Sequence, residues 1–398
     1  MLMSLATANV QRVLIALCQV AALSCWFSAS AVAPSLSADL DITGIASVAL
    51  TSSVQLGFVL GAIASAVLNI ADRFPAHQVF CVSATFAAGC TFVLPLCAST
   101  FSVVALLRLC TGVALAGVYP IGVKLIASWA TPATRALALG ILVGALTLGS
   151  ALPQLIRGIG PQSWQSVMFS AAAVTLVGGL VTGKCVTAGP HLQAARPVSD
   201  PGYALRMFTE RRPRLAVLGY LGHMWELYAL WTWMPAFILA SQQARDGSTG
   251  SVVHLTAFAA IGAAGVLGCL IGGYAADRFG RSPAAVSAMV LSALCCILSP
   301  LLFAKALSLL AAFLFVWGAA VIADSGVFST ALSETANPRL VGTALTAQTA
   351  FGFLLTIITI HLVPVLADHI GWRWALTVLA IGPSLGALAM SRYADRAR

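Results

Sequence analysis

The chain has 398 residues, of which 60% are apolar and only 8% are charged. This composition excludes an ordinary water-soluble domain, in which about a quarter of the residues carry a charge, and it indicates a chain that resides in a lipid bilayer. The formal net charge of +9 is what retention of basic residues on one side of a membrane produces, so it predicts no nucleic-acid partner.

Apolar segments long enough to cross a bilayer follow one another along the chain. A spanning helix needs about 20 mostly apolar residues, and twelve segments of that length are separated by short polar or Pro- and Gly-containing breaks. We therefore predict an all-α membrane protein with twelve transmembrane helices. The segments lie near 10–33, 44–70, 77–97, 101–127, 134–157, 163–185, 212–240, 251–275, 282–303, 306–332, 339–363 and 372–391.

The first segment has one feature of a secretory signal, because its apolar run ends in SASAVAP at 28–34, a small-x-small cleavage pattern. The run is longer than the apolar part of a typical signal, and a single Arg12 is its only charged lead-in. The first segment is also the repeat partner of the seventh. We predict a retained transmembrane helix.

Basic residues are distributed unevenly between the loops on the two sides of the membrane. Positive residues are retained on the cytoplasmic side of short loops, and most of the 21 Lys and Arg residues fall on the side that holds both termini and the central loop. The other side holds Arg157, Arg245, Lys305 and Arg373, while Arg108 lies within a segment. Both termini are predicted to be cytoplasmic, and the compact loops without glycosylation sequons suit a bacterial inner membrane.

Patterns that would indicate an enzyme do not fit their surroundings. The ten Cys residues are scattered through apolar segments as small hydrophobic residues. The stretch GGLVTGKC at 178–185 approaches a phosphate-binding loop, but Cys185 replaces the hydroxyl residue and no strand precedes it. None of the six His residues has zinc-protease spacing. We predict no enzymatic activity, no metal and no cofactor, with a proton gradient as the energy source.

The sequence repeats itself once, at low similarity. NIADRF at 69–74 recurs as YAADRF at 274–279, in both cases after an even-numbered segment. The repeat predicts two six-helix halves in parallel orientation, residues 1–185 and 212–398. Residues 186–211 between them begin rich in Gly and Pro and end basic, which predicts a cytoplasmic linker. Its second part either remains a loop or lies on the membrane as a short amphipathic helix.

Pairs of glycines four residues apart occur at matching places in the two halves. Gly57 and Gly61 lie in the second segment, and Gly268 and Gly272 lie in the eighth. Small residues at this spacing let helices in a membrane approach closely. Close helix contacts are therefore predicted at these four positions.

Three motifs resemble the signatures of one family. GGYAADRFGRS at 272–282 closely resembles the G-x-x-x-D-R-x-G-R motif of the major facilitator superfamily, and RLCTGVALAG at 108–117 resembles the fourth-span motif. LNIADRFPAH in the first half departs from the signature, with Pro75 and Ala76 where Gly and Arg belong. The resemblance implies two pseudo-symmetric six-helix bundles, alternating access, and a central cavity lined by spans one, four, seven and ten.

A charged cluster is predicted where the eighth span ends. Asp277 and Arg281 are four residues apart and can pair across a helical turn, and Glu334 closes span ten on the same side. The resemblance implies that such a cluster latches the cytoplasmic side in one conformation, and the alternative is ordinary positive-inside loop charge. The predicted gate residues are Asp72, Arg73, Asp277, Arg278, Arg281 and Glu334.

An acid stands inside the seventh span, in GHMWELYALWTW at 222–233. A carboxylate at mid-span costs about 2.5–3.5 kcal/mol, so such residues face a bundle interior or water and mark ion or substrate pathways. Glu226 shares a helix stripe with His223. Arg108 and Asp324 fall in spans four and ten, which the resemblance places at the cavity. The alternative is that these charges pair inside the bundle and take no part in transport.

These residues predict a secondary active transporter that moves a small solute by alternating access, with a buried carboxyl group taking up and releasing a proton. Arg108 suits an anionic solute, because a guanidinium keeps its charge. Aromatic and polar stripes on the cavity spans are either solute contacts or packing. The predicted substrate and coupling residues are Arg108, Tyr119, His223, Glu226 and Asp324, with Gln19, Trp26, Ser30, Trp233 and Trp317 as candidate cavity contacts.

Direction and solute remain open between alternatives. GVYPIGVKLIASW at 117–129 resembles the fourth span of organic-anion importers of the superfamily, which favours import of a small anion. Proton-driven efflux of drugs or metabolites is the second interpretation. A resemblance to the drug exporters of the superfamily would imply a Gly-Pro pair in span five, and this sequence lacks it. A membrane sensor is a distant third. The expected partners are a small-molecule substrate and the lipid bilayer, with the protein a monomer.

Overall fold

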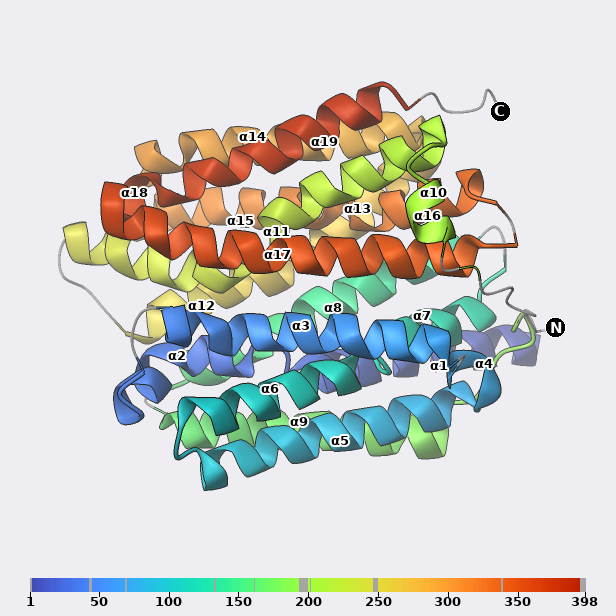
Figure 1. The fold of residues 1–398 in the computed structure, drawn as a ribbon, viewed down its shortest axis with the longest axis horizontal. Coiled ribbons are helices and arrows are strands. Elements are labelled where there is room, and N and C mark those ends of the chain that lie inside the picture. The colour runs from blue at the N-terminus through green and yellow to red at the C-terminus, as the bar shows by residue number, and fades with distance from the viewer. Residues whose placement is uncertain are drawn as a thin grey trace. The chain divides into compact units, whose positions relative to one another are not determined.

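The computed structural model describes residues 2–42, 45–68, 70–131, 134–160, 162–192, 200, 202–245, 250–337 and 339–393. All regular elements in these ranges are helices (Figure 1). Within this part of the chain, eleven helical segments are long and apolar enough to cross a membrane. The predicted all-α membrane architecture is confirmed.

The predicted seventh span is one helix, α11 (Arg211–Arg245), and it is absent from those eleven segments. Its 35 residues are ample for a crossing. Its sequence explains why it is less apolar than the others, because His223, Glu226 and a run of Trp and Tyr residues occupy its middle. The least apolar long helix therefore carries the candidate chemistry.

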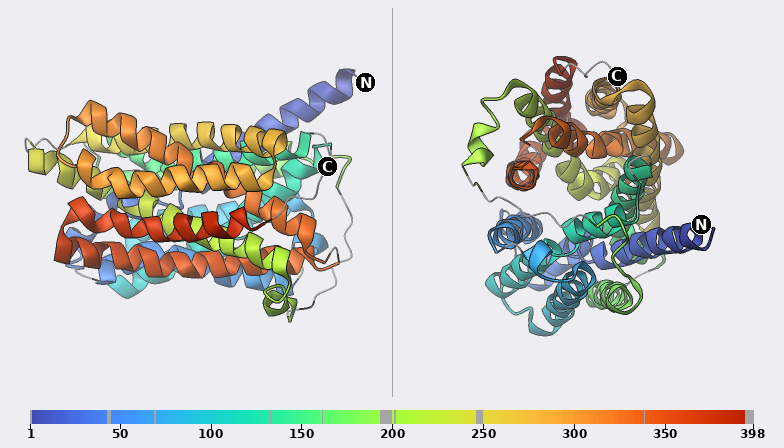
Figure 2. Two further views of the ribbon diagram at one scale, coloured as in Figure 1. Left: turned by 90° about the horizontal axis from the view of Figure 1, so that it is seen from above. Right: turned by 90° about the vertical axis from the view of Figure 1, so that its right-hand side faces the viewer.

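The chain folds into two compact units, Met1–Arg196 and Pro197–Arg398, and their boundary lies inside the predicted linker 186–211. Within each unit the long helices run side by side (Figures 1 and 2). Unit 1 contains α1 (Leu2–Leu23), α2 (Ser28–Asp39), α3 (Ile45–Val67), α4 (Ile70–Arg73), α5 (Ala76–Cys97), α6 (Phe101–Leu115), α7 (Tyr119–Ser128), α8 (Arg135–Gly158) and α9 (Trp164–Cys185).

Unit 2 begins with a short helix and continues with the second set of spans. Besides α11, its helices are α10 (Tyr203–Arg206), α12 (Ser251–Phe258), α13 (Ala264–Phe279), α14 (Arg281–Leu302), α15 (Leu307–Ala323), α16 (Ser325–Thr335), α17 (Val341–Ile370), α18 (Trp372–Ala375) and α19 (Ile381–Ser391). A π-helical turn, Ala259–Ala263, joins α12 to α13, and a 3-10 turn, Leu376–Ala380, joins α18 to α19.

Three predicted spans are broken helices. The first span breaks at residues 24–27 between α1 and α2, and the fourth breaks at 116–118 between α6 and α7. Pro120 fits beside the second break, because a proline is tolerated in the first turn of a helix. The tenth span breaks at Asp324, between α15 and α16. A break frees backbone groups that need other partners, since lipid offers none.

Close glycine contacts form as predicted in both units. A Cβ on Gly57 would lie 2.0 Å from the carbonyl oxygen of Leu109, and one on Gly272 would lie 1.8 Å from that of Ala323. Gly61 and Gly268 meet backbone carbonyls in the same way. Because these neighbours are backbone atoms, no side chain can turn away. The glycines therefore fix the packing of α3 on α6 and of α13 on α15.

The half-helix α2 is held at its side and its end by other helices of unit 1. Arg157 in α8 donates from Nη1 to the carbonyl oxygen of Ala31 at 2.8 Å, and Trp164 in α9 donates from Nε1 to Asp39 Oδ2 at 2.5 Å. The apolar face of α2 packs into a cluster that includes Leu36. These contacts keep α2 in place although the chain is broken before it.

The predicted linker starts as part of unit 1. Trp129 Nε1 donates to the carbonyl oxygen of Thr187 at 2.8 Å, and the backbone amide of Gly189 donates to Ser128 Oγ at 2.8 Å. The first residues of the linker therefore lie against the end of α7. The second part of the linker, for which the sequence predicts either a loop or a short amphipathic helix, contains a helix of four residues, α10. Its Tyr203 hydroxyl accepts a hydrogen bond from the Asn337 amide at 2.9 Å.

Candidate buried acid site

Glu226 lies near the middle of α11 with 1% of its surface exposed. Its Oε1 atom accepts hydrogen bonds from Ser292 Oγ at 2.6 Å, from Trp317 Nε1 at 2.6 Å and from Cys296 Sγ at 3.2 Å. The first and third donors come from α14 and the second from α15. Three helices of unit 2 therefore meet at one carboxylate oxygen.

The donor set leaves the protonation of Glu226 free to change. An indole nitrogen can only donate, so Oε1 remains an acceptor in both states of the carboxyl group, and a proton taken up by Glu226 resides on Oε2. Within the described residues, no Lys, Arg or His lies within ion-pair distance of Glu226. Only neutral hydrogen-bond donors therefore stabilise the charged form of Glu226. Without a permanent positive partner, the carboxyl group can both release and take up a proton.

His223 and Asp324 form a second buried pair in unit 2. The Nδ1 atom of His223 lies 2.8 Å from Asp324 Oδ1, and the two side chains are 1% and 3% exposed. The His223 ring packs 5.6 Å from the ring of Phe328, centroid to centroid. Its Nε2 atom is buried and has no hydrogen-bond partner, so this nitrogen is available for a hydrogen bond to a solute group.

The position of Asp324 follows from the helix break. Asp324 ends α15 and precedes α16, with φ −90° and ψ −6°. The pairing with His223 is between elements distant in sequence, one mid-helix and one at a break. The sequence placed both residues on cavity spans, and the structure brings them together.

Arg108 occupies a different environment from the one expected for a solute-binding group. It is fully buried, and its Nη1 donates to the carbonyl oxygen of Cys25 at 3.0 Å and to Ser28 Oγ at 3.3 Å. Its Nη2 donates to the carbonyl oxygen of Trp26. The guanidinium therefore satisfies carbonyl groups that the break in the first span leaves open.

We predict that Arg108→Met lowers the thermal unfolding temperature of the purified protein strongly. A buried group that loses its donor costs up to roughly 1–3 kcal/mol. This variant removes a donor from the carbonyl oxygens of Cys25 and Trp26 and from Ser28 Oγ, and the bond from Ser28 Oγ to the Cys25 carbonyl oxygen at 2.9 Å offsets part of that loss. Arg108→Lys keeps the positive charge but has one donating nitrogen in place of two. Its unfolding temperature should therefore lie between those of the unchanged protein and Arg108→Met. Equal unfolding temperatures for all three proteins would contradict this role.

Most of the candidate cavity contacts form hydrogen bonds or ring contacts with residues of their own unit. Ser30 Oγ lies 2.9 Å from Thr51 Oγ1, and Trp233 Nε1 donates to the carbonyl oxygen of Ile360 at 2.9 Å. The Trp26 ring lies 5.0 Å from that of Phe58. Trp317 is the donor to Glu226 described above. Tyr119 is half-buried at the first position of α7.

Gln19 differs from these residues, because its amide is buried and unmatched. Neither Oε1 nor Nε2 of Gln19 has a hydrogen-bond partner, and the residue is 0% exposed. Its amide lies against α7, where a Cβ on Gly122 would come within 2.1 Å of Oε1. An amide with both polar atoms unpaired calls for an explanation, such as water or a ligand.

The charged cluster of unit 2 is present, but Asp277 and Arg281 belong to two successive helices, α13 and α14, and do not pair across one helical turn. Arg281 donates from Nη1 to Asp277 Oδ1 at 2.9 Å and from Nη2 to Glu334 Oε1 at 3.3 Å, so it bridges the end of α13 and the end of α16. Arg278 and Arg73 are exposed. The side chain of Asp72 lies outside the described residues. The latch function of the cluster stays a prediction.

Two donors to Glu226 were missed by sequence reasoning. Ser292 and Cys296 are small residues in an apolar span, and nothing in their composition marks them as functional. Their spacing of four residues places them on one face of α14, which is the only signal that points to them. Trp317 was predicted as a cavity contact, and the structure shows the carboxylate that it contacts.

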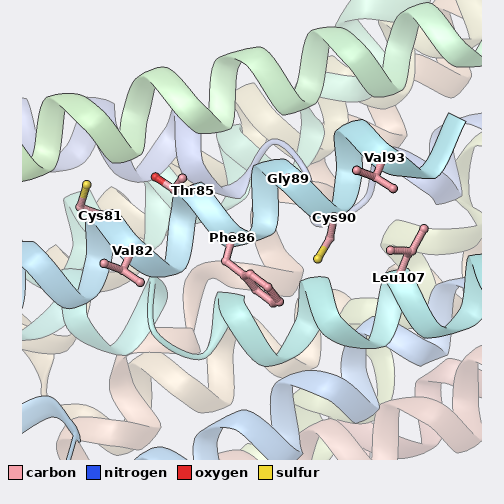
Figure 3. Close-up of a pocket in the computed structure, with 8 residues that line it drawn as sticks. All are labelled: Cys81, Val82, Thr85, Phe86, Gly89, Cys90, Val93 and Leu107. Carbon is pink, nitrogen blue, oxygen red and sulfur yellow. The ribbon is translucent and has the colours of Figure 1, made fainter. Parts of the chain in front are cut away.

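An open apolar groove of about 610 Å³ lies on unit 1 (Figure 3). It runs along α5, with Leu107 of α6 at its edge. Val82 and Phe86 are 69% and 55% exposed there. Such a surface suits acyl chains of the surrounding bilayer, and it contains none of the predicted site residues.

The fold has the features of a multi-pass membrane transporter: broken membrane-spanning helices, close glycine contacts and ionisable groups buried inside a helical unit. The family model described as the Major Facilitator Superfamily matches residues 15–359 and also 216–397. The chain belongs to the Major Facilitator Superfamily. It is therefore a secondary transporter of small molecules and not an enzyme.

Solved structures share the fold at low identity. A structure of the proton:xylose symporter XylE bound to 6-bromo-6-deoxy-D-glucose is 14% identical, with a TM-score of 0.74, covering 97% of this chain and 95% of that one. The nucleoside transporter NupG, as a D323A mutant, is 17% identical with a TM-score of 0.72, covering 96% and 99%. A search of curated proteins finds no match.

Proposed function

We propose that the chain couples movement of a small solute to protons, with Glu226 as the principal proton-binding group. The observation that carries this proposal is the carboxyl group of Glu226, which is 1% exposed and held by three neutral donors. Burial penalises the charged form, and neutral donors offset that penalty only in part. A change in hydration or in donor geometry between two facing states then changes whether the proton is held.

His223 and Asp324 form the second element of the proposed coupling. They lie in the same unit as Glu226, and His223 is three residues before it on α11. A proton on His223 strengthens its attraction to Asp324, and its loss weakens it. Because Asp324 stands at the break of span ten, this change acts on the joint between α15 and α16.

The proposed solute is recognised by hydrogen bonds and not by Arg108. The expectation of an anionic solute depended on a free guanidinium, and both terminal nitrogens of Arg108 donate within unit 1. Gln19 instead offers a donor and an acceptor side by side. A neutral solute with hydroxyl or amide groups suits that pair. Proton:xylose symport is found on this fold, which supports proton coupling with such a solute.

The test is reconstitution of the purified protein into liposomes that contain a pH-sensitive dye. A panel of sugars, nucleosides, carboxylates and cationic drugs is added outside, and the internal pH is followed. Solute-driven acidification indicates symport, whereas solute-driven alkalinisation of acid-loaded liposomes indicates antiport and efflux. Responses only to carboxylates would overturn the neutral-solute proposal. Labelled-solute uptake that leaves the internal pH unchanged would overturn the coupling.

Gln19→Leu is predicted to raise the KM for the active solute while leaving the number of protons moved per solute unchanged. The substitution removes the donor and the acceptor but retains an apolar side chain of similar size. Gly122→Ala is the matched variant, because its added Cβ displaces the same amide oxygen without deleting it. Both should shift KM in labelled-solute uptake. An unchanged KM in both variants would show that Gln19 does not contact the solute.

A further inference from the structure

The eighth span contains a π-helical turn, the one such turn in the part of the chain that the structure describes. The turn covers Ala259–Ala263, where the amide of Ala264 donates to the carbonyl oxygen of Ala259, five residues earlier in place of four. Such turns are rare and are found often at functional sites. Ala260 and Ile261 in this turn are buried, so the turn packs against other helices of the protein.

The π turn contacts α15 at Gly318, the residue that follows Trp317. A Cβ on Gly318 would lie 1.9 Å from the carbonyl oxygen of Ala260 and 2.7 Å from its carbonyl carbon. The next residue, Ala319, has a similar contact, because a Cβ on Gly268 of α13 would lie 2.1 Å from the Ala319 carbonyl oxygen. Two successive residues of α15 are therefore held by backbone contacts with the eighth span. We call these two contacts the glycine seat.

The indole of Trp317 extends from the backbone that the glycine seat holds. Trp317 and Gly318 point in different directions, because consecutive residues are about 100° apart around the axis of an α-helix. While Gly318 faces the π turn, the Trp317 indole reaches α11 and donates to Glu226 Oε1 at 2.6 Å. The Phe313 ring, one turn earlier on α15, lies 5.7 Å from the Trp317 ring. The position of this donor therefore depends on where the seat places α15.

The hydrogen bond from Trp317 to Glu226 tolerates little displacement of α15. Its length of 2.6 Å is already short for a nitrogen donor, for which about 2.7–3.2 Å is usual. A shift of α15 against α11 can therefore only lengthen or bend the bond. At about 3.6 Å such a contact is no longer a hydrogen bond. A displacement of roughly 1 Å is enough to remove the donor from Glu226.

We propose that the glycine seat sets the distance between Trp317 and Glu226, so that Gly318 and Gly268 are positioning residues of the buried acid site. A side chain at position 318 would have to displace a backbone carbonyl group by roughly 1 Å, because real Cβ atoms essentially never approach closer than 3.0 Å. The consequence for proton coupling rests on the proposed function of Glu226, whereas the positioning of the indole does not.

The test is infrared spectroscopy of the purified full-length protein. Subtracting the spectrum of Glu226→Gln isolates the band of the Glu226 carboxyl group in whichever protonation state it has, and the same subtraction is made in each variant. Trp317→Phe shows where the band moves when the indole donor is lost. Gly318→Ala deletes no polar group, yet it should move the band in the same direction. Solute-driven proton movement should slow about tenfold, as expected for the loss of one hydrogen bond to an acid.

Two further variants separate the seat from general overpacking. Gly57→Ala is the matched control, because its Cβ would lie 2.0 Å from the carbonyl oxygen of Leu109 in unit 1, which does not contain Glu226. The Glu226 band should stay in place in this control. Gly268→Ala presses on α15 from the other helix of the seat, so it should act like Gly318→Ala. It decides the question if Gly318→Ala does not fold.

The outcomes distinguish the positioning role from the proposed function. An unmoved Glu226 band in folded Gly318→Ala would overturn the positioning role, and so would an equal movement of the band in Gly57→Ala. A moved band together with unchanged proton movement would leave the positioning role standing and remove Glu226 from the proposed coupling.

Discussion

Glu226→Gln is expected to abolish solute-driven proton movement while leaving the protein folded. The amide oxygen of Gln can still accept the bonds from Trp317 and Ser292, so the three-helix contact around this atom persists. The variant cannot exchange a proton, so the pH change in dye-loaded liposomes should fall to that of empty liposomes. Solute counterflow, which needs no net proton movement, should persist.

Two control variants separate the loss of proton exchange from the loss of a charge and from the loss of stability. Glu210→Gln removes the same charge at an exposed position just before α11, and proton movement should be unaffected. Glu226→Ala leaves the donors of Trp317, Ser292 and Cys296 without an acceptor, at roughly 1–3 kcal/mol for each buried group, so it should also unfold at lower temperature. Normal proton movement in Glu226→Gln would assign coupling elsewhere, with Asp324 and His223 next.

Gly272→Ala is expected to destabilise unit 2, and Gly273→Ala is expected to stabilise it slightly. A Cβ at Gly272 would lie 1.8 Å from the carbonyl oxygen and 2.6 Å from the carbonyl carbon of Ala323, whereas a Cβ at Gly273 meets nothing within 4 Å. Overpacking costs about 1–3 kcal/mol and more where backbone must move. In an open helix position, Ala is favoured over Gly by roughly 0.5–1 kcal/mol.

The pair of adjacent substitutions is its own control, because both are Gly→Ala changes in α13. Thermal unfolding in detergent, followed by the fraction of monodisperse protein, gives the two shifts. Opposite signs are predicted. Shifts of the same sign and size would mean that the close contact of α13 with α15 does not limit stability.

Much of the architecture could be read from the sequence because its signals are periodic and repeated. Long apolar segments set the spans, and glycine pairs at four-residue spacing set the contacts of α3 with α6 and of α13 with α15. Asp277 and Arg281 pair because they lie close together in the chain, on either side of Gly280, where α13 ends and α14 begins. These are local rules, and each involves residues close together in the chain or repeated in both halves.

The sites were harder to predict because their partners lie far apart in the chain. Nothing near Arg108 in the sequence shows that residues 24–27 form a break whose carbonyl groups need donors. The expectation of an anion-binding Arg108 followed from its charge alone, and the structure gives the guanidinium a backbone partner set instead. In the same way, the role of Ser292 and Cys296 becomes visible only when the fold brings them within hydrogen-bond distance of Glu226 on α11.

The two units divide the buried chemistry unequally. Unit 2 contains Glu226, His223 and Asp324, whereas unit 1 contains Arg108, which bonds to backbone, and the unmatched amide of Gln19. We propose on this basis that unit 2 handles protons and unit 1 contributes neutral solute contacts. Variants in unit 1 should then change KM, and variants at the acids of unit 2 should change coupling.

The proton occupancy of Glu226 itself can be measured by infrared difference spectroscopy on the reconstituted protein, with and without the transported solute. The account predicts a carbonyl stretch of a protonated carboxyl group that changes on solute addition near neutral pH and is absent from Glu226→Gln. An unchanged solute-induced band in Glu226→Gln, or no protonated carboxyl signal at any pH at which the solute drives protons, would contradict it.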